Sequence, residues 1–402
     1  MRVCVGTVVH HPEDARIMHR QIRALLAAGH EVTYIAPFTD CNVTPPPEIR
    51  AIDVPRAVGR RRGRALRAAW SALRRGVRDA DVLLVHDLEL LLVLPPERRR
   101  PPTVWDVHED AAGALDDRPD LPGFARRPLH ALTRWLEDQA ERRLRLILAE
   151  ESLSERFPGG HPVVPDTTYV PPVPPAPPKD RRVVYVGRLS HTRGAADMIE
   201  LARRLAPHGI RLDLIGPADP PTRALLRDAQ RTGLLDWYGH VPNRHALRMA
   251  EGALAGLSLL HDAPHHRRSL PAKVIEYMAH GVPVVTTPLP MAASLVGRVD
   301  CGVIVPFGDV AAAARAVLRL KDDPERRAAM GARGYAEALH HFHWPDHATE
   351  FVGYLERLAA TPATVSAHHG KTRLNADHGD GPAGTPAAGP HLPTPMTHSR
   401  PA

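Results

Sequence analysis

Residues 269–287, SLPAKVIEYMAHGVPVVTT, contain the pattern that decides the fold of this chain. The first part predicts a short helix on which Lys273, Glu276 and His280 share one face, because residues three and four apart are neighbours on a helix. The opposite face is apolar, as expected for a helix that packs on a core. The polar face either contacts solvent, as most charged helix faces do, or lines a ligand-binding cleft.

The ends of this helix carry residues that favour helix termini. We expect Ser269 to be the N-cap, Pro271 to lie in the first turn and Gly281 to adopt the left-handed conformation that stops the helix. The apolar run at 282–287 then predicts a buried strand. A helix followed directly by a buried strand is typical of a parallel α/β fold.

The same alternation of apolar runs and amphipathic helical patterns extends along most of the chain. Expected strands lie at 2–9, 31–38, 80–87, 103–110, 182–189, 210–218, 234–241, 254–261, 282–287 and 301–309. Helices are expected between them, at 14–30, 194–209, 220–232, 243–253 and 310–323. Short buried strands separated by helices predict parallel sheets with both faces covered, so the fold class is α/β.

A proline-rich segment at 158–182 interrupts this alternation and favours an extended linker. The pattern therefore predicts two Rossmann-like halves with a ligand cleft between them. The expected organisation is an N-terminal domain at 1–165, a linker at 166–182, a second domain at 183–343, a helix at 344–360 that packs back on the N-terminal domain, and a disordered tail at 361–402.

The composition favours a cytoplasmic globular protein. Of the 402 residues, 43% are hydrophobic, and the formal net charge is +7. No apolar run reaches the ~18–20 residues that a membrane-spanning helix needs, and we expect no signal peptide, because the first residues have the pattern of a strand. The cysteines, Cys4, Cys41 and Cys301, have neither metal-ligand spacing nor the spacing of a disulfide framework.

Residues 56–78 contain the densest cluster of positive charge. The arginines of this segment surround Trp70 and Leu73 at helical spacing, and no acidic residue lies among them, so we predict a basic amphipathic helix over 56–78. Such a helix suits peripheral contact with the inner face of an anionic membrane, although a solvated helix would have the same pattern. Aromatic residues make up only 4% of the chain and do not interleave with these arginines, so we predict no nucleic-acid partner.

The segment VYVGRLSHTRG at 184–194 predicts an anion-binding loop. A strand runs into Gly187, and Arg188 and Arg193 then precede a helix that begins at Gly194. Arginine donates bidentate, charge-assisted hydrogen bonds, and a helix N-terminus supplies oriented N–H groups. The loop therefore suits a diphosphate, although two surface arginines in a solvated loop would give the same pattern.

These motifs together resemble those of the family-four retaining glycosyltransferases. GRLSHTRG resembles their phosphate-binding loop, SLPAKVIEYMAHGVPVV resembles their nucleotide-binding helix, and HHPEDARI, VHDLELL and DVHED resemble the cleft loops of their acceptor domain. With YGHVP, the resemblance runs in order across about residues 1–345. It implies a GT-B fold, in which two Rossmann-like domains face each other across a cleft. It also implies sugar transfer from a nucleotide-sugar donor with retention of configuration, and without a metal or other cofactor.

The resemblance also implies roles for individual residues. Arg188 and Arg193 would hold the diphosphate, Glu276 would bind the ribose, and His108 would contact the donor sugar near its anomeric centre. The other donor-side residues are Gly6, Gly187, Gly239, Val241, Ser269, Leu270 and Lys273. On the acceptor side are His11, Asp14, Arg16, His86, Asp87 and Glu109.

One residue departs from the family pattern. The family often has a glutamate eight residues before the position of Glu276, where this chain has Arg268. The donor sugar and the acceptor, a lipid-linked glycan or a small-molecule aglycone, therefore remain open. Two alternatives also stay open: a nucleotide-sugar epimerase of similar architecture, and a non-catalytic nucleotide-sugar-binding partner of another transferase.

Overall fold

The computed structural model describes residues 1–108, 111–112, 123–177, 179 and 181–361, which belong to one compact unit. The predicted tail at 361–402 lies outside the described residues except for Thr361, and so does Glu109. None of the described helices is long and apolar enough to cross a membrane.

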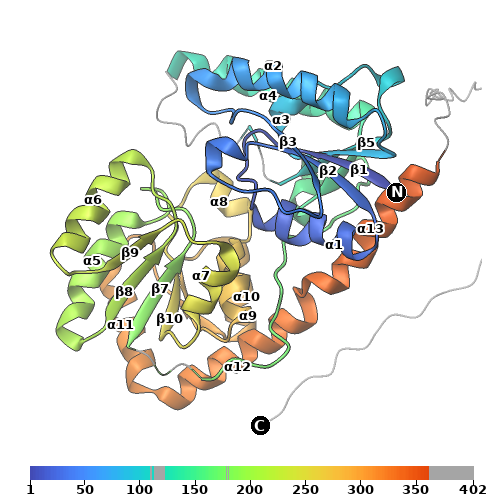
Figure 1. The fold of residues 1–402 in the computed structure, drawn as a ribbon. Coiled ribbons are helices and arrows are strands. Elements are labelled where there is room, and N and C mark those ends of the chain that lie inside the picture. The colour runs from blue at the N-terminus through green and yellow to red at the C-terminus, as the bar shows by residue number, and fades with distance from the viewer. Residues whose placement is uncertain (109–110, 113–122, 178, 180, 362–402) are drawn as a thin grey trace, which may run out of the picture. The chain divides into compact units, whose positions relative to one another are not determined.

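The first half of the chain folds into a parallel six-stranded sheet with the order β3-β2-β1-β4-β5-β6 (Figure 1). The strands are β1 (Arg2–Gly6), β2 (Glu31–Ala36), β3 (Arg50–Asp53), β4 (Val82–Val85), β5 (Thr103–Val107) and β6 (Arg145–Leu148). The central strands β1, β4 and β5 are buried along almost their whole length, as expected for a sheet covered on both faces. Four of these strands match the predicted alternation, whereas β3 and β6 are additional.

Helices cover both faces of this sheet. One face packs on the π-helix Ala15–Ile22, on α1 (Arg23–Ala27) and on α13 (Trp344–Ala360), the last helix described. The other face carries α2 (Arg62–Gly76), α3 (Leu88–Leu91) and α4 (Gly123–Arg143). Trp344, Phe351 and Leu355 of α13 are buried in the core of the first sheet.

The second half forms another parallel six-stranded sheet with the order β12-β11-β10-β7-β8-β9. The strands are β7 (Arg182–Val186), β8 (Arg211–Ile215), β9 (Asp236–Gly239), β10 (Ala255–Ser258), β11 (Val284–Thr286) and β12 (Gly302–Ile304). The helices are α5 (Ala195–Leu205), α6 (Pro220–Arg231), α7 (Asn243–Ala250), α8 (Pro264–Arg268), α9 (Ala272–Ala279), α10 (Pro290–Val299), α11 (Val310–Asp322) and α12 (Pro324–His341). Each expected strand of this half is present, so the prediction of two Rossmann-like sheets is confirmed.

Helix α9 is the helix predicted from residues 269–287, but its N-terminus differs from the expectation. Pro271 is the N-cap residue and no side chain caps the helix, so the prediction of Ser269 as N-cap was wrong. Ser269 is instead the extended residue that ends α8, which places it two residues before the N-cap of α9. Gly281 has φ +64°, as predicted for the residue that terminates the helix.

Two further elements begin or end away from the predicted positions. The basic helix expected over 56–78 is the shorter α2, which follows a 3-10 turn at Gly59–Arg61. Gly59, with φ +52°, gives this turn a backbone conformation that an α-helix does not contain. Residues 166–177 form neither a helix nor a named strand, and Thr168 pairs with His343 beside the start of α13.

Candidate functional site

A cavity of about 530 Å³ lies at the carboxyl ends of strands from both sheets. Helix α9 and the segment before it supply one part of its wall, and the loops after β5 and β6 supply another. Ligands of parallel α/β sheets bind at these strand ends. Of the predicted site residues, seven line the cavity: His108, Gly187, Arg193, Ser269, Leu270, Lys273 and Glu276.

The polar face of α9 is directed into this cavity rather than into solvent. Lys273 and Glu276 are both buried and both line the cavity. His280 differs, because its Nδ1 contacts the Glu251 carboxylate at 2.8 Å. Of the three polar residues on this face, Lys273 and Glu276 therefore line the cavity, whereas His280 contacts Glu251.

Packing of Tyr277 fixes the orientation of α9. Its hydroxyl accepts a hydrogen bond from the backbone N–H of Val186 at 2.8 Å and donates one to the carbonyl of Leu257 at 3.2 Å. Gly256 makes room for the ring, because a Cβ atom there would lie 2.4 Å from it. The apolar face of the helix is thereby locked on β7 and β10, and its polar face is left toward the cavity.

The loop after β7 brings cationic groups to the same place. Gly187, with φ +132°, lies so close to Gly216 that a Cβ on Gly216 would be 1.9 Å from the Gly187 carbonyl oxygen. Lys273 fits beside this turn, with its Nζ 5.1 Å from the centre of the Tyr185 ring. Burial, together with the like charge of Arg193, lowers the pKa of Lys273 to about 7. An anion in the cavity would restore the full charge of this ammonium group.

The two arginines of the predicted anion-binding loop differ in position. Arg193 is half-buried and lines the cavity. Arg188 is exposed and is not among the described residues that line the cavity, and its carbonyl oxygen accepts a hydrogen bond from the Tyr185 hydroxyl at 2.6 Å. The geometry therefore favours Arg193 over Arg188 as the cation closest to a bound diphosphate.

Glu276 is held by a partner that sequence reasoning missed. Asn243, the first residue of α7, donates a hydrogen bond from Nδ2 to the Glu276 carboxylate at 2.8 Å. The remaining lone pairs of this buried carboxylate can accept hydrogen bonds from hydroxyl groups in the cavity. This arrangement suits a pair of vicinal hydroxyls such as those of ribose.

His108 enters the cavity from the opposite sheet and belongs to a buried network around Asp106. Its Nε2 lies 3.0 Å from the Asp106 carboxylate and 3.0 Å from Nδ1 of His86. Burial would lower the pKa of His108, but the adjacent negative charge of Asp106 outweighs it and raises that pKa. Burial lowers the pKa of His86 to about 4, so His86 is neutral near pH 7 and its Nδ1 can accept a hydrogen bond from Nε2 of His108.

Arg16 and Gln21 complete this network from the π-helix. Arg16 makes a bidentate ion pair with Asp106, with distances of 2.8 and 2.7 Å, and Gln21 Nε2 donates to the same carboxylate at 2.7 Å. Burial disfavours the charged carboxylate, but the guanidinium of Arg16 holds the pKa of Asp106 well below its usual range. Arg16 was predicted near the acceptor; it is buried, and its partner is Asp106.

The other predicted residues of the first half position the loop after β1. Asp87 accepts hydrogen bonds from the Thr7 hydroxyl and from the backbone of Val8 and Val9. Asp14 caps the π-helix through the N–H groups of Arg16 and Ile17. These contacts are typical of residues that orient a loop.

Three predicted glycine and valine positions lie apart from the cavity. Gly6 faces Leu90 and Leu73 in the core rather than an open site. Gly239 has φ +66° at the end of β9, and Val241 packs against the core of the second sheet. His240 between them contacts His11 of the first half, with ring centroids 4.7 Å apart.

The cavity also contains charged residues that the sequence did not indicate. Glu150, which follows β6, lines it, and burial together with the nearby Asp166 raises the pKa of Glu150 to about 8. Arg134 and Arg156 line it as well, and Arg156 pairs with Glu137 and Asp138. No local pattern marks these residues, because each becomes part of the site only through the packing of distant elements.

Two family models match the two halves of the chain. Residues 15–151 match the model described as Glycosyltransferase Family 4, and residues 169–337 match the model described as Glycosyl transferases group 1. A protein of Escherichia coli (strain K12), described as the putative colanic acid biosynthesis glycosyltransferase WcaL, is 26% identical over 189 residues. This match spans 46% of the chain and 47% of that protein, so the chain matches less than half the length of this relative.

Solved structures of similar fold cover most of the chain. A sucrose-phosphate synthase from Thermosynechococcus elongatus has a TM-score of 0.66 at 19% identity and covers 89% of this chain and 98% of its own. HepE from Anabaena, solved with UDP and glucose, has a TM-score of 0.64 at 15% identity and covers 88% of this chain and 99% of its own. These similarities show that the two sheets form a GT-B fold.

Proposed function

We propose that this chain, a glycosyltransferase of the group 1 type, transfers a sugar from a nucleoside-diphosphate donor to an acceptor hydroxyl with retention of configuration. The observation that carries the proposal is the composition of one cavity. Two cations, Arg193 and Lys273, lie beside the buried carboxylate Glu276, and His108 reaches the same cavity from the other sheet. A diphosphate, a ribose and a sugar are the groups that such a set of side chains would bind.

The reaction breaks the bond between the anomeric carbon and the diphosphate oxygen. Negative charge develops on the leaving diphosphate, where Arg193 and Lys273 would stabilise it. The acceptor oxygen attacks the same face of an oxocarbenium-like centre, and its proton passes to the departing phosphate oxygen. Nδ1 of His108 would form a hydrogen bond with a sugar hydroxyl, while Asp106 holds the ring in place through Nε2.

The first test identifies the donor. Unfolding midpoints of the full chain are measured with UDP, GDP, TDP, ADP and CDP and with their common sugar conjugates, because a ligand that binds only the folded state raises its stability. We expect one nucleotide to give a clear rise. Turnover of that donor without acceptor would indicate an epimerase, tight binding without any turnover would indicate a non-catalytic partner, and no rise with any nucleotide would contradict the proposal.

Glu276→Ala is expected to weaken nucleotide binding by roughly 10- to 100-fold, since hydrogen bonds to a charged group contribute about 1.5–3 kcal/mol. Isothermal titration with the nucleotide chosen by the first test measures this loss. Glu251→Ala is the control, because Glu251 contacts His280 outside the cavity. Equal affinity of the wild type and Glu276→Ala would show that the ribose binds elsewhere.

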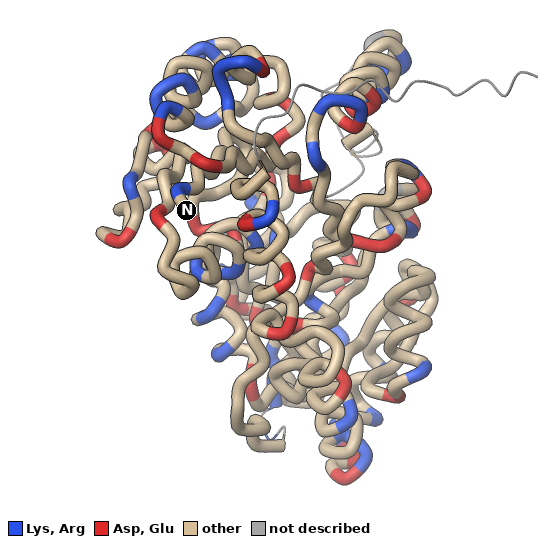
Figure 2. Tube along the Cα trace, turned by 90° about the vertical axis from the view of Figure 1, so that its right-hand side faces the viewer, with Lys and Arg blue, Asp and Glu red and all other residues tan. Residues whose placement is uncertain are grey.

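For the acceptor, we propose a glycan or lipid-linked intermediate at an anionic membrane surface. The partial similarity to the putative colanic acid transferase supports a polysaccharide acceptor. Helices α2, α3 and α4 lie side by side (Figure 1). Large apolar side chains are exposed on α2, on α4 and directly after α3, namely Trp70, Leu92, Phe124, Leu132 and Trp135. The two views differ by a rotation about the vertical axis, so α2, at the top of Figure 1, is also at the top of Figure 2. Lys and Arg residues recur at this level. Exposed aromatic rings among arginines are typical of proteins that bind such surfaces.

Binding to vesicles that contain phosphatidylglycerol tests this surface. We expect co-sedimentation at low salt that falls steeply as salt is added, because the attraction is electrostatic. The double substitution Arg64→Glu and Arg67→Glu on exposed positions of α2 should abolish it, whereas Arg227→Glu and Arg231→Glu on α6 should not. Absent or salt-insensitive binding of the wild type would contradict the proposal.

A further inference from the structure

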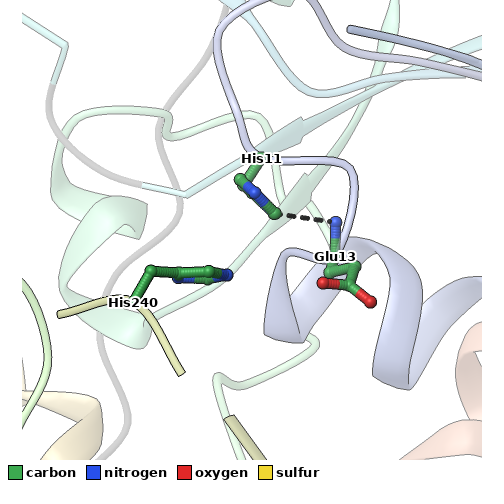
Figure 3. Close-up of side chains that lie close together, drawn as sticks. All are labelled: His11, Glu13 and His240. Atoms are coloured by element: carbon green, nitrogen blue, oxygen red, sulfur yellow. Dashed lines mark hydrogen bonds between the residues drawn. The ribbon is translucent and has the colours of Figure 1, made fainter. Parts of the chain in front are cut away.

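Two loops from different sheets bring together three side chains that ligate transition metals. His11 follows β1, His240 follows β9, and Glu13 lies two residues after His11 (Figure 3). The two imidazole rings are 4.7 Å apart at their centroids, and one ligand atom from each of the three residues lies within 4.8 Å of the other two. Residues that are more than two hundred positions apart in the chain thus form one compact donor set.

The chemistry of this set favours a zinc ion. Two histidines and a glutamate form one of the common three-residue zinc sites in proteins, with bond lengths of about 2.0–2.2 Å. Those bonds place tetrahedral ligand atoms about 3.4 Å apart, so small side-chain rotations would close the observed spacing. Nδ1 of His11 accepts a hydrogen bond from the backbone N–H of Glu13 at 3.2 Å, which orients the ring and leaves its Nε2 as the atom that would ligate the ion (Figure 3).

We propose that His11, Glu13 and His240 bind one Zn²⁺ ion that connects the loop after β1 with the loop after β9. These residues are not among the described residues that line the main cavity, so the ion would not take part in the transfer reaction. Three protein ligands leave a fourth position for water or another exchangeable ligand. The ion would hold the two loops together and would thereby stabilise the folded chain.

A second group of potential ligands is less suitable. His86, Asp106 and His108 also have ligand atoms within 4.8 Å of one another. However, Arg16 already makes a bidentate ion pair with Asp106, and a divalent cation beside this guanidinium would be repelled. Among the described residues, His11, Glu13 and His240 make no ion pair with an arginine; His11 and Glu13 are partly buried, and His240 is exposed.

The test is a titration of the full chain with Zn²⁺ alone, and with Co²⁺ as a spectroscopic probe of tetrahedral ligation. We expect the wild type to bind one more ion than His240→Gln or Glu13→Gln, and its unfolding midpoint to rise with Zn²⁺. The matched control is His341→Gln, on an exposed histidine of α12, which should behave like the wild type.

Several results would overturn the proposal. They are equal Zn²⁺ stoichiometry and affinity of the wild type and His240→Gln, and a Co²⁺ spectrum without tetrahedral bands. Because the chain has 25 histidines, weak binding elsewhere is expected, and only the difference between variants counts. Equal unfolding midpoints of all variants without metal show that loss of binding does not come from misfolding. Since neither titration uses nucleotide, failure here leaves the transferase proposal intact.

Discussion

Replacing Arg193 by alanine is expected to lower kcat/KM by roughly 10²- to 10³-fold, the loss typical of removing one preorganised donor to a charge that develops in the transition state. Arg193 is half-buried and lines the cavity beside Lys273. Lys273 has its pKa lowered to about 7 by burial and by Arg193. Without Arg193, the leaving diphosphate would lose the guanidinium donor beside Lys273, whereas the other arginines that line the cavity, Arg134, Arg156 and Arg268, come from other segments of the chain.

Two matched variants make the expectation specific. Arg188→Ala removes the exposed arginine of the same loop and is expected to reduce kcat/KM by less than a factor of ten. Arg193→Lys keeps the charge but loses the bidentate geometry, so activity between those of the wild type and Arg193→Ala is expected. Initial rates with the donor identified by thermal shift measure all three. A larger loss in Arg188→Ala than in Arg193→Ala would reverse the assignment of the two arginines.

Most of the fold could be predicted because its strands are short apolar runs with clear limits. The runs that became β1, β2, β4 and β5, and the four central strands of the second sheet, are largely buried and carry little ambiguity. The edge strands β9 and β12 are partly exposed, but each lies within a longer apolar run that marked it. The strand β3 was missed because its sequence, RAID, has only two apolar residues between two charged ones and lies at the exposed edge of the sheet. Edge strands lose the continuous apolar pattern that marks central ones.

The candidate site was predictable where one element supplies several residues. Lys273 and Glu276 are one turn apart on α9, so the helical period alone places them together. The helical period also places His280 on this face, but it could not show that His280 contacts Glu251, which lies in a turn distant in sequence, instead of lining the cavity. Glu150 and Asn243 were missed because only tertiary packing brings them to the cavity and to Glu276.

The spacing of residues within a loop does not show which of their side chains points into the cavity. Arg188 and Arg193 have equal standing in the sequence GRLSHTRG, but only Arg193 lines the cavity among the described residues. The turn at Gly187 and the start of α5 after Gly194 set these directions. Both glycines have positive φ. Turn propensity predicts this backbone conformation, but it does not predict in which direction the neighbouring side chains then point.

The largest loss of stability is expected from Arg16→Met. This change leaves the carboxylate of Asp106 charged and fully buried without its bidentate partner, and such a loss typically costs about 3–5 kcal/mol of the free energy of unfolding. The hydrogen bonds from Gln21 and His108 remain and offset part of the cost. Urea unfolding followed by fluorescence measures the difference from the wild type.

The control for Arg16→Met is the exposed ion pair between Arg2 and Asp81, with 52% and 35% of the side chains accessible. Arg2→Met should cost no more than about 1 kcal/mol, because exposed pairs are screened by water. The double change Arg16→Met with Asp106→Leu removes both charges and should recover part of the lost stability, since the main penalty is the unpaired charge and not the absent bond. If Arg16→Met cost as little as Arg2→Met, Asp106 would have to be protonated or hydrated in the folded chain, and the network that orients His108 would not be the one described.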